Sequence, residues 1–226
     1  MTVATLSASD QTAAVQRRAM VDSQLRTNDV NDPALVAALL ETAREPHLPE
    51  AARAGAYIDR AIPLSEGRAL NPPLTTARLM ADASIKAGQN VLLIGAATGY
   101  CAALIAALGA RVTAVEEKAA LIALGRAALG ERSDIRWVEA PLTAGAPDGA
   151  PYDVMIVDGA IEALPQALLA QLRPGARVAT GLADGSVTRL ARAVAIEGGA
   201  PVAPYAFADL ECVHLPGFAA PPRFTF

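Results

Sequence analysis

Near the middle of the chain, a glycine-containing run joins an apolar stretch to a stretch with the composition of a helix. Residues 91–100 read VLLIGAATGY, and Glu116 and Glu117 follow Gly95 by 21 and 22 residues. Gly95 lets the chain turn sharply toward a ligand, and Gly99 stands at a helix start, where free N–H groups favour a carboxylate or a phosphate. An acid at the end of the next strand can accept both ribose hydroxyls of a nucleoside. The spacing therefore predicts a nucleoside-cofactor site.

The loop itself indicates which nucleoside is bound. A dinucleotide site uses G-x-G-x-x-G, so that bare backbone meets the pyrophosphate, whereas this loop reads G-A-A-T-G. S-adenosylmethionine has no phosphate and can place its carboxylate at the helix N-terminus and its ribose on the acid. The loop therefore favours a class I methyltransferase. An NAD-linked oxidoreductase is the weaker alternative, because no catalytic His, Lys or Tyr pattern can be placed on the chain.

The same region also fits a membrane helix with a G-x-x-x-G face, because residues 91–110 carry no charge. Gly95 and Gly109 bracket a helix of only about 13 residues, roughly 20 Å long, which is too short to span a bilayer. Three more strand-like runs follow at once. We therefore expect a strand, a turn and a helix here.

Strand-like and helix-like runs alternate from residue 90 onward, which predicts a doubly wound, mostly parallel sheet. Strands are expected at 91–95, 111–117, 135–140, 152–158 and 176–182, with further strands in 190–196 and 211–218. Helices are expected between them at 96–108, 118–130 and 163–175. Before residue 90 the sequence predicts helices at 11–27, 34–43, 49–55 and 74–88, and an ordered loop at 56–74. Asp32 and Pro33 are typical of a helix start, and Gly88 of a helix end.

The composition bears on partners and location. A net charge of −4 on 226 residues gives no electrostatic footprint for nucleic acid or an anionic membrane. No apolar run with a basic flank is recognised near the first residue, so a cytoplasmic protein is expected. Cys101 and Cys212 are interpreted as small buried hydrophobes. His47 and His214 lack metal-ligand spacing, so no metal site is expected.

Eight stretches, taken in order, resemble the protein-L-isoaspartate O-methyltransferase family. They are MVDSQLR (20–26), AREPHLP (43–49), AYIDRAIPL (56–64), EGRALNPP (66–73), VLLIGAATGY (91–100), VTAVEE (112–117), PYDVMIVDGA (151–160) and LPQALLAQLRPGARV (164–178). The resemblance extends from about residue 18 to residue 218. It implies a Rossmann-like methyltransferase that uses S-adenosylmethionine to esterify the α-carboxyl group of isoaspartyl residues in damaged proteins. Ester formation promotes succinimide closure and repair to aspartate.

The substrate loop departs from the family pattern G-x-T-I-S-x-P. Residues 67–73 read GRALNPP, so that Ala69 and Asn71 stand where the family has threonine and serine. The resemblance implies that this serine hydroxyl bonds the reacting carboxylate. Asn71 also carries N–H donors and could hold a carboxylate, or it could cap the helix that begins at Pro72 and Pro73. Both interpretations stay open.

The cofactor residues depart from the family as well. Leu93 replaces an acid, Ala97 replaces a middle glycine, and Ala140-Pro141-Leu142 replaces a G-D-G motif whose acid helps to hold the adenine end. A later acid, Asp158, ends the run 152–158 and could face the same crevice, although an acid at the rim of the sheet is the favoured interpretation.

These observations combine into one prediction. The fold is α/β and Rossmann-like, with an N-terminal helical extension and substrate loop in residues 1–88 and a cofactor-binding core in 89–226. The function is S-adenosylmethionine-dependent methylation of isoaspartyl proteins or peptides, without nucleic acid or membrane; the alternative is a divergent homologue that is inactive, regulatory or specific for another substrate. Substrate contacts are assigned to Ala69, Leu70, Asn71 and Pro72, with Asn71 as the catalytic residue. Cofactor contacts are assigned to Gly95, Ala96, Ala97, Gly99, Glu116, Glu117 and Leu142.

Overall fold

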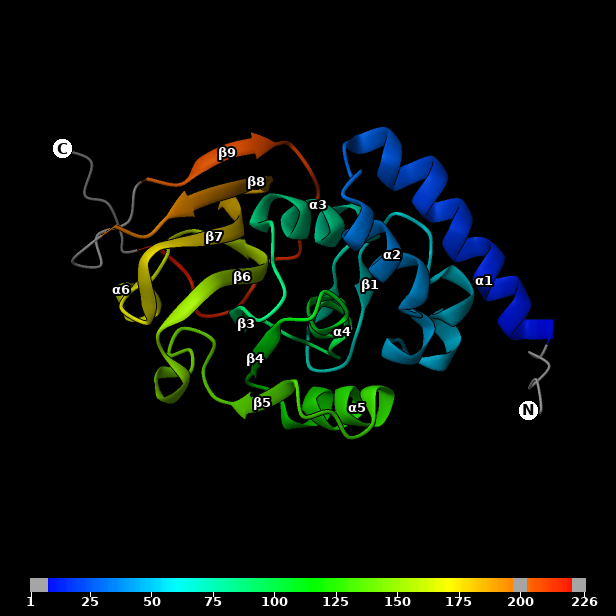
Figure 1. Cartoon of the computed structure of the whole chain (residues 1–226), viewed down its shortest axis with the longest axis horizontal. Coiled ribbons are helices and arrows are strands. Elements are labelled where there is room, and N and C mark those ends of the chain that lie inside the picture. The colour runs from blue at the N-terminus through cyan, green and yellow to red at the C-terminus, as the bar shows by residue number, and fades with distance from the viewer. Residues whose placement is uncertain (1–7, 197–202, 221–226) are drawn as a thin grey trace.

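A seven-stranded sheet forms the centre of the computed structural model, which describes residues 8–196 and 203–220 (Figure 1). Its strand order is β5-β4-β3-β6-β7-β8-β9. The pairs from β5 to β7 are parallel, and β8 and β9 add antiparallel strands at one edge. The strands of this sheet are β3 (Asn90–Ile94), β4 (Arg111–Glu116), β5 (Ile135–Glu139), β6 (Tyr152–Ile161), β7 (Leu172–Asp184), β8 (Val187–Val194) and β9 (Tyr205–Ala208).

Strand β3 shows why the sheet is buried on both faces. Val91, Leu92, Leu93 and Ile94 are all fully buried. Successive side chains of a strand point to opposite faces, and these four divide in that way: Val91 and Leu93 belong to one core, and Leu92 and Ile94 to the other. A nearly continuous apolar run is typical of a parallel strand covered on both sides.

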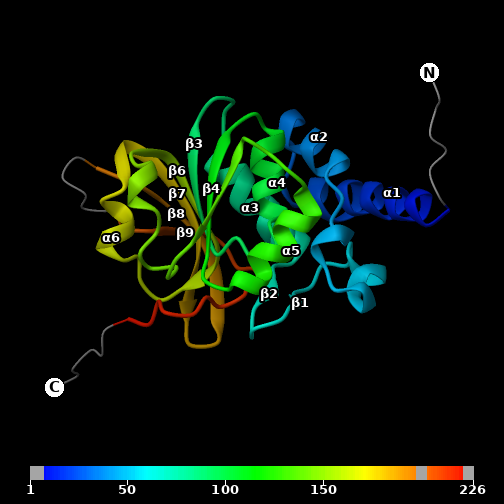
Figure 2. The ribbon, with the colours of Figure 1, turned by 90° about the horizontal axis from the view of Figure 1, so that it is seen from below.

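The two faces are covered unequally (Figure 2). Helices α3 (Pro73–Ala83), α4 (Tyr100–Ala107) and α5 (Ala119–Leu129) lie on one side of the sheet, and the short helix α6 (Gln166–Leu169) lies on the other. No helix within the described residues is long and apolar enough to cross a membrane.

The N-terminal helices pack into the same core as the sheet. Leu25 and Leu39 share one hydrophobic cluster with Leu93 and Ile105. These helical elements are α1 (Ala8–Met20), η1 (Val21–Leu25), η2 (Arg26–Asn28), α2 (Pro33–Glu41), η3 (Glu45–His47) and η4 (Glu50–Gly55). The start of α2 is as predicted: the Asp32 side chain accepts from the Leu35 N–H at 2.9 Å, and Pro33 is the first helical residue.

Three details near the substrate loop correct the sequence-based expectations. The stretch 56–74 contains a small antiparallel hairpin of β1 (Ile62–Pro63) and β2 (Ala69–Leu70). Helix α3 ends at Ala83, and its C-cap Ser84, in the left-handed conformation, lies four residues before the expected stop at Gly88. Its N-cap is Pro72, with no side-chain capping bond.

The C-terminal third also differs from expectation. Strand β6 runs three residues past Asp158, α6 covers only part of the expected helix 163–175, and the strand β9 was not predicted. The stretch 211–218 forms no strand; it contributes one isolated bridge, between His214 and Ala160 of β6. Proline at 216 and glycine at 217 interrupt regular pairing there.

Candidate active site

The glycine loop at the end of β3 is a tight turn anchored to the neighbouring strand. The N–H groups of Gly95 and Ala96 both donate to the carbonyl of Val115 at 3.1 Å. Gly95 and Gly99 have φ values of +77° and +84°, and Ala97 has a φ of +48°. An L-residue other than glycine rarely adopts this left-handed region. The alanine that replaces the family's glycine is therefore held in a strained backbone conformation.

Glu116, the proposed ribose acceptor at the end of β4, is completely buried. Its carboxylate forms an ion pair with the Arg68 guanidinium at 2.5 Å, and Arg68 is buried too. The same carboxylate accepts from the backbone N–H groups of Ala97 at 2.9 Å, Glu117 at 3.0 Å and Lys118 at 3.2 Å. The substrate loop and the cofactor strand thus meet directly, through one side chain from each.

Leu215 lies against the backbone of the glycine loop at Gly95. A Cβ atom added to Gly95 would be 3.0 Å from Leu215 Cδ1, and one added to Gly159 would be 2.4 Å from Leu215 Cγ. Leu215 is held in place because its N–H donates to the Ala160 carbonyl at 3.0 Å. The bare backbone at Gly95 and Gly159 is therefore covered by a leucine side chain of the same protein.

Asn71 of the substrate loop is buried in a polar network. Its Nδ2 donates to Asp158 Oδ1 at 2.8 Å, and its Oδ1 accepts from the Val213 N–H at 2.8 Å. Thr76 Oγ1 donates to the same Asp158 oxygen at 3.3 Å. Asn71 does not cap α3, so that interpretation was wrong.

Asp158 also corrects an expectation. It is buried inside β6, beside a register irregularity between Ile156 and Ala160 that turns the strand locally, and it is not a solvated acid at the rim. Burial raises the pKa of its carboxyl group, while the hydrogen bond from Asn71 opposes the shift. The carboxylate instead faces Asn71 of the substrate loop and Thr76 of α3.

Beneath the substrate loop lies a buried arginine. Arg44 donates through Nη2 to the backbone carbonyl of Asn71, and its guanidinium stacks 4.8 Å from the centre of the Tyr100 ring. Its Nε and Nη1 have no hydrogen-bond partner within the part of the chain that the structure describes. The favourable contact with the ring face compensates part of the cost of burying this charge.

The remaining predicted site residues are spread around this centre. Glu117 is partly exposed and pairs with Lys118 at 3.3 Å. Ala69 and Leu70 form strand β2, next to Pro72 at the start of α3. Leu142 is buried in the second core, on the opposite face of the sheet from Ala96 and Ala97. The structure thus joins Asn71, the glycine loop and Glu116 in one region and places Leu142 inside the protein.

Two surface hollows flank the Arg68–Glu116 pair. One of about 280 Å³ is lined by Glu66, Gly67, Arg68, Glu117, Lys118, His214, Leu215 and Pro216. The other, of about 340 Å³, is lined by Glu117, Lys118, Glu139, Ala140 and Pro141. Glu117 and Lys118 therefore form a ridge between them, just outside the buried pair.

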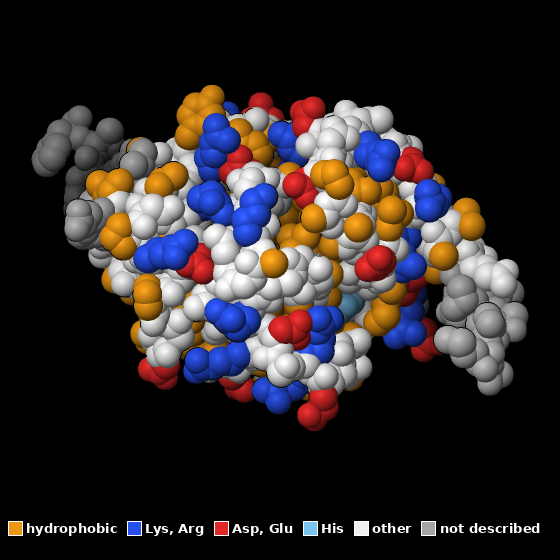
Figure 3. All heavy atoms as spheres, in the orientation of Figure 1, with side chains coloured by type: hydrophobic (Ala, Val, Ile, Leu, Met, Phe, Trp, Pro, Cys, Tyr) orange, Lys and Arg blue, Asp and Glu red, His pale blue; other side chains and the backbone are white. Residues whose placement is uncertain are grey.

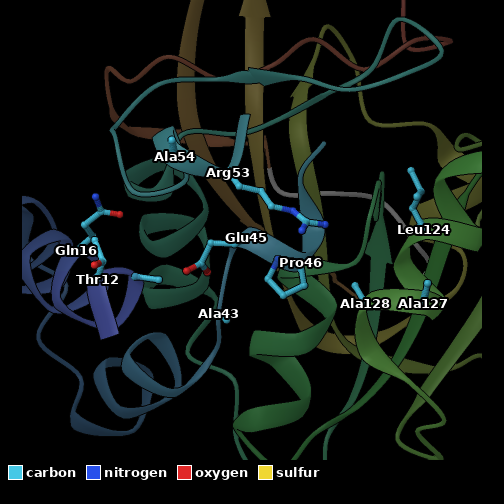
Figure 4. Close-up of a pocket in the computed structure, with 11 residues that line it drawn as sticks. Thr12, Gln16, Ala43, Glu45, Pro46, Arg53, Ala54, Leu124, Ala127 and Ala128 are labelled. Carbon is cyan, nitrogen blue, oxygen red and sulfur yellow. The ribbon is translucent and has the colours of Figure 1, made fainter. Parts of the chain in front are cut away.

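A larger pocket of about 780 Å³ lies away from this centre, between α1 and α5 (Figure 4). Glu45 and Pro46 stand between Thr12 on α1 and Leu124 on α5.

On the molecular face shown in Figure 3, acidic and basic side chains are interspersed.

Sequence reasoning missed the residues that close the site. Arg68 occupies an unspecified position of the substrate-loop pattern, and Leu215 lies in a stretch expected to be a strand. Arg68 could have been identified because it is a long, positively charged side chain in the substrate loop, and that loop was expected to lie near the acid Glu116. No local pattern could have placed Leu215 against Gly159, because they are 56 residues apart in the sequence.

Comparison with known proteins decides the family. The family model "Protein-L-isoaspartate(D-aspartate) O-methyltransferase (PCMT)" matches residues 15–199. The chain belongs to the protein-L-isoaspartate O-methyltransferase family. Protein-L-isoaspartate O-methyltransferase 1 of Rhodopseudomonas palustris is 36% identical over 182 residues, covering 79% of this chain and 74% of its own length. The Herpetosiphon aurantiacus enzyme is 33% identical, covering 78% of this chain and 80% of its own length.

Solved structures confirm the predicted fold. A protein-L-isoaspartate O-methyltransferase matches with a TM-score of 0.76 and 22% identity, over 89% of this chain and 66% of its own. A Plasmodium falciparum structure with S-adenosyl-L-homocysteine matches with a TM-score of 0.73 and 15% identity, over 90% of this chain and 97% of its own. The architecture is therefore the Rossmann-like class I methyltransferase fold.

Family membership confirms the predicted activity and cofactor. The chain is an S-adenosylmethionine-dependent protein-L-isoaspartate O-methyltransferase, and the comparisons do not favour an inactive or regulatory scaffold. In the described structure, both the Glu116 carboxylate and the Gly95 backbone are in contact with other parts of the protein. The Glu116 carboxylate accepts from Arg68, Glu117 and Lys118 through Oε1 and from Ala97 through Oε2, and Leu215 covers the glycine backbone.

Proposed function

We propose that the chain methylates isoaspartyl carboxyl groups at the crevice between the substrate loop 67–73 and the glycine loop 95–99. The observation that carries this assignment is the contact between Arg68 and Glu116, which joins the two loops at the carboxyl edge of the sheet. Ligands of open α/β sheets bind at this edge. The substrate is then a protein or peptide whose isoaspartyl carboxylate reaches loop 67–73.

The proposed chemistry needs positioning more than proton transfer. A carboxylate with a pKa near 4 is already ionised at neutral pH, so no general base is required. The protein has to orient the carboxylate and exclude water. We assign the orienting role to Asn71, because its amide nitrogen carries a second hydrogen besides the one given to Asp158. Ala69, Leu70 and Pro72 would form the wall beside it.

We propose that the substrate and the cofactor are bound by different parts of the chain. Residues 1–88 would supply the substrate loop, and residues 89–226 the cofactor side. With a net charge of −4, we propose protein substrates without nucleic acid or membrane partners, in the cytoplasm.

The test is incubation with labelled S-adenosylmethionine at millimolar concentration and a pair of peptides that differ only in one isoaspartyl or aspartyl linkage. We expect base-labile methyl ester on the isoaspartyl peptide alone, and a loss of at least tenfold in Asn71→Ala. The matched control is Arg132→Gln, because Arg132 is exposed just before β5 and its side chain pairs with Asp134. Label on both peptides, or on neither at saturating cofactor, would contradict the proposed substrate.

A further inference from the structure

Arg68 takes the very carboxylate that a nucleoside ribose would use. We propose that Arg68 and Leu215 form an internal plug of the cofactor site, so that S-adenosylmethionine binds only after this plug withdraws. This inference rests on the proposed function, since it concerns access to the same crevice. It makes the described conformation a closed, autoinhibited state of the enzyme.

The Glu116 carboxylate is already occupied by donors of the protein itself. Its two oxygens accept four donors: the Arg68 guanidinium and the N–H groups of Ala97, Glu117 and Lys118. A carboxylate offers about four lone-pair positions. Three of these donors share Oε1, and only the Ala97 N–H donates to Oε2, so one lone-pair position is left on Oε2 among the contacts of the described residues. Ribose hydroxyls are themselves donors, and two of them can bond to this carboxylate together only if a partner of Oε1 leaves. Arg68 is the one partner that belongs to a side chain and can leave without unfolding the glycine loop.

The side chains of Leu215 and Arg68 also cover the backbone of Gly95. Leu215 lies within 3.1 Å of the position of a Cβ on Gly95, and Arg68 Nη2 lies 3.4 Å from the same position. Both plug residues therefore meet at the residue whose bare backbone should face the cofactor. Their burial, at 5% and 7% exposure, shows that they fill this space rather than flank it.

Arg68 lies on a short hairpin at the surface, which could move it away from Glu116. Arg68 lies on the hairpin β1–β2, whose strands have two residues each. The hairpin turn contains Glu66 and Gly67 at positive φ, and Glu66, Gly67 and Arg68 line the 280 Å³ hollow at the surface. Elements with few ladder bonds open at low free-energy cost. The hairpin can therefore carry Arg68 outward while β4 and the glycine loop stay in place.

The experiment is calorimetric titration of the full chain with S-adenosylhomocysteine. Arg68→Gln removes the guanidinium, and Leu215→Ala removes the cover without touching the ion pair. Arg60→Gln is the matched control, because Arg60 is exposed on the same segment. We expect Arg68→Gln and Leu215→Ala each to bind S-adenosylhomocysteine at least tenfold more tightly than the unmodified protein does. Arg60→Gln should bind it with the affinity of the unmodified protein.

Breaking a buried ion pair destabilises a protein, so Arg68→Gln is also followed by its melting temperature. The plug predicts a lower melting temperature without ligand and a larger rise on adding S-adenosylhomocysteine than in the unmodified protein. If Arg68→Gln does not fold, the affinity of Leu215→Ala for S-adenosylhomocysteine alone tests the plug. Equal affinity in the folded variants and the unmodified protein would overturn the plug. Tighter binding without methylation of the isoaspartyl peptide would uphold the plug and refute the proposed substrate.

Discussion

The side chains of Thr98 and His47 each form a hydrogen bond with the backbone carbonyl of the other residue. Thr98 Oγ1 donates to the His47 carbonyl at 2.7 Å, and His47 Nδ1 lies 2.5 Å from the Thr98 carbonyl. The glycine loop is thereby tied to η3, the short helical turn that follows Arg44. Both residues are buried, so water cannot replace either bond.

This pairing predicts a pH dependence of stability. Burial is the main cause that lowers the pKa of His47 below 6.5. Between that lowered pKa and 6.5, the unfolded chain binds a proton that the folded protein does not. The contribution of His47 to stability is therefore complete above pH 6.5 and falls as the pH drops below it, by up to about 1.4 kcal/mol per pH unit.

Urea unfolding between pH 8 and pH 5 checks this prediction. His47→Asn, which keeps an N–H donor near the position of Nδ1, should flatten the decline below pH 6.5. The matched control is His214→Asn, because His214 is the other histidine and is exposed. A decline that disappears in the His214 variant and persists in the His47 variant would refute the assignment.

Replacing Ala97 by glycine should stabilise the protein. The φ of +48° at Ala97 costs an L-residue roughly 1–2 kcal/mol, which glycine avoids at some cost in chain entropy. We expect Ala97→Gly to raise the free energy of unfolding by about 1 kcal/mol. Ala96→Gly is the control: Ala96 has no positive φ, so the same change should lower stability. Equal effects at the two positions would show that the loop is not strained.

Asn71 and Asp158 should be energetically coupled. Removing either partner leaves the other buried with an unmet hydrogen bond, at a cost of about 1–3 kcal/mol. In a double-mutant cycle of Asn71→Ala and Asp158→Ala, the second change should cost less once the first is made. The free energies of unfolding give the coupling directly, and additive losses would mean that the bond contributes nothing.

Both cysteines should resist modification in the folded protein. Burial raises the pKa of the Cys101 thiol and of the Cys212 thiol, so little reactive thiolate is present near neutral pH. We expect a thiol reagent to label neither residue until denaturant is added, and then to label both. Rapid labelling of the native protein at Cys212 would show that the segment beside Leu215 opens on its own.

Local patterns were sufficient for much of the fold. The apolar run of β3, the cap at Asp32 and the stop at Gly130 each depend on neighbouring residues, and the structure has them as predicted. The missed strand β9 depends on pairing with β8, which the local sequence does not record. Helix α3 ends early, at Ala83, where the sequence carries no glycine to mark the stop.

The residues of the candidate site likewise fall into those that local spacing could place and those that it could not. Gly95, Gly99 and Glu116 could be found from spacing alone, because a strand, a turn and a helix fix their separations. Arg68 and Leu215 could not, since they reach the site from a hairpin and from a distant C-terminal segment. The question of whether the site is open or closed is decided by those two residues.

A crystal structure of the protein with S-adenosylhomocysteine tests most directly whether Arg68 and Leu215 close the cofactor site. We expect the ribose hydroxyls to donate to the Glu116 carboxylate and the Arg68 guanidinium to have moved away from it. A bound ligand beside an intact Arg68–Glu116 ion pair would show that Arg68 does not close the site.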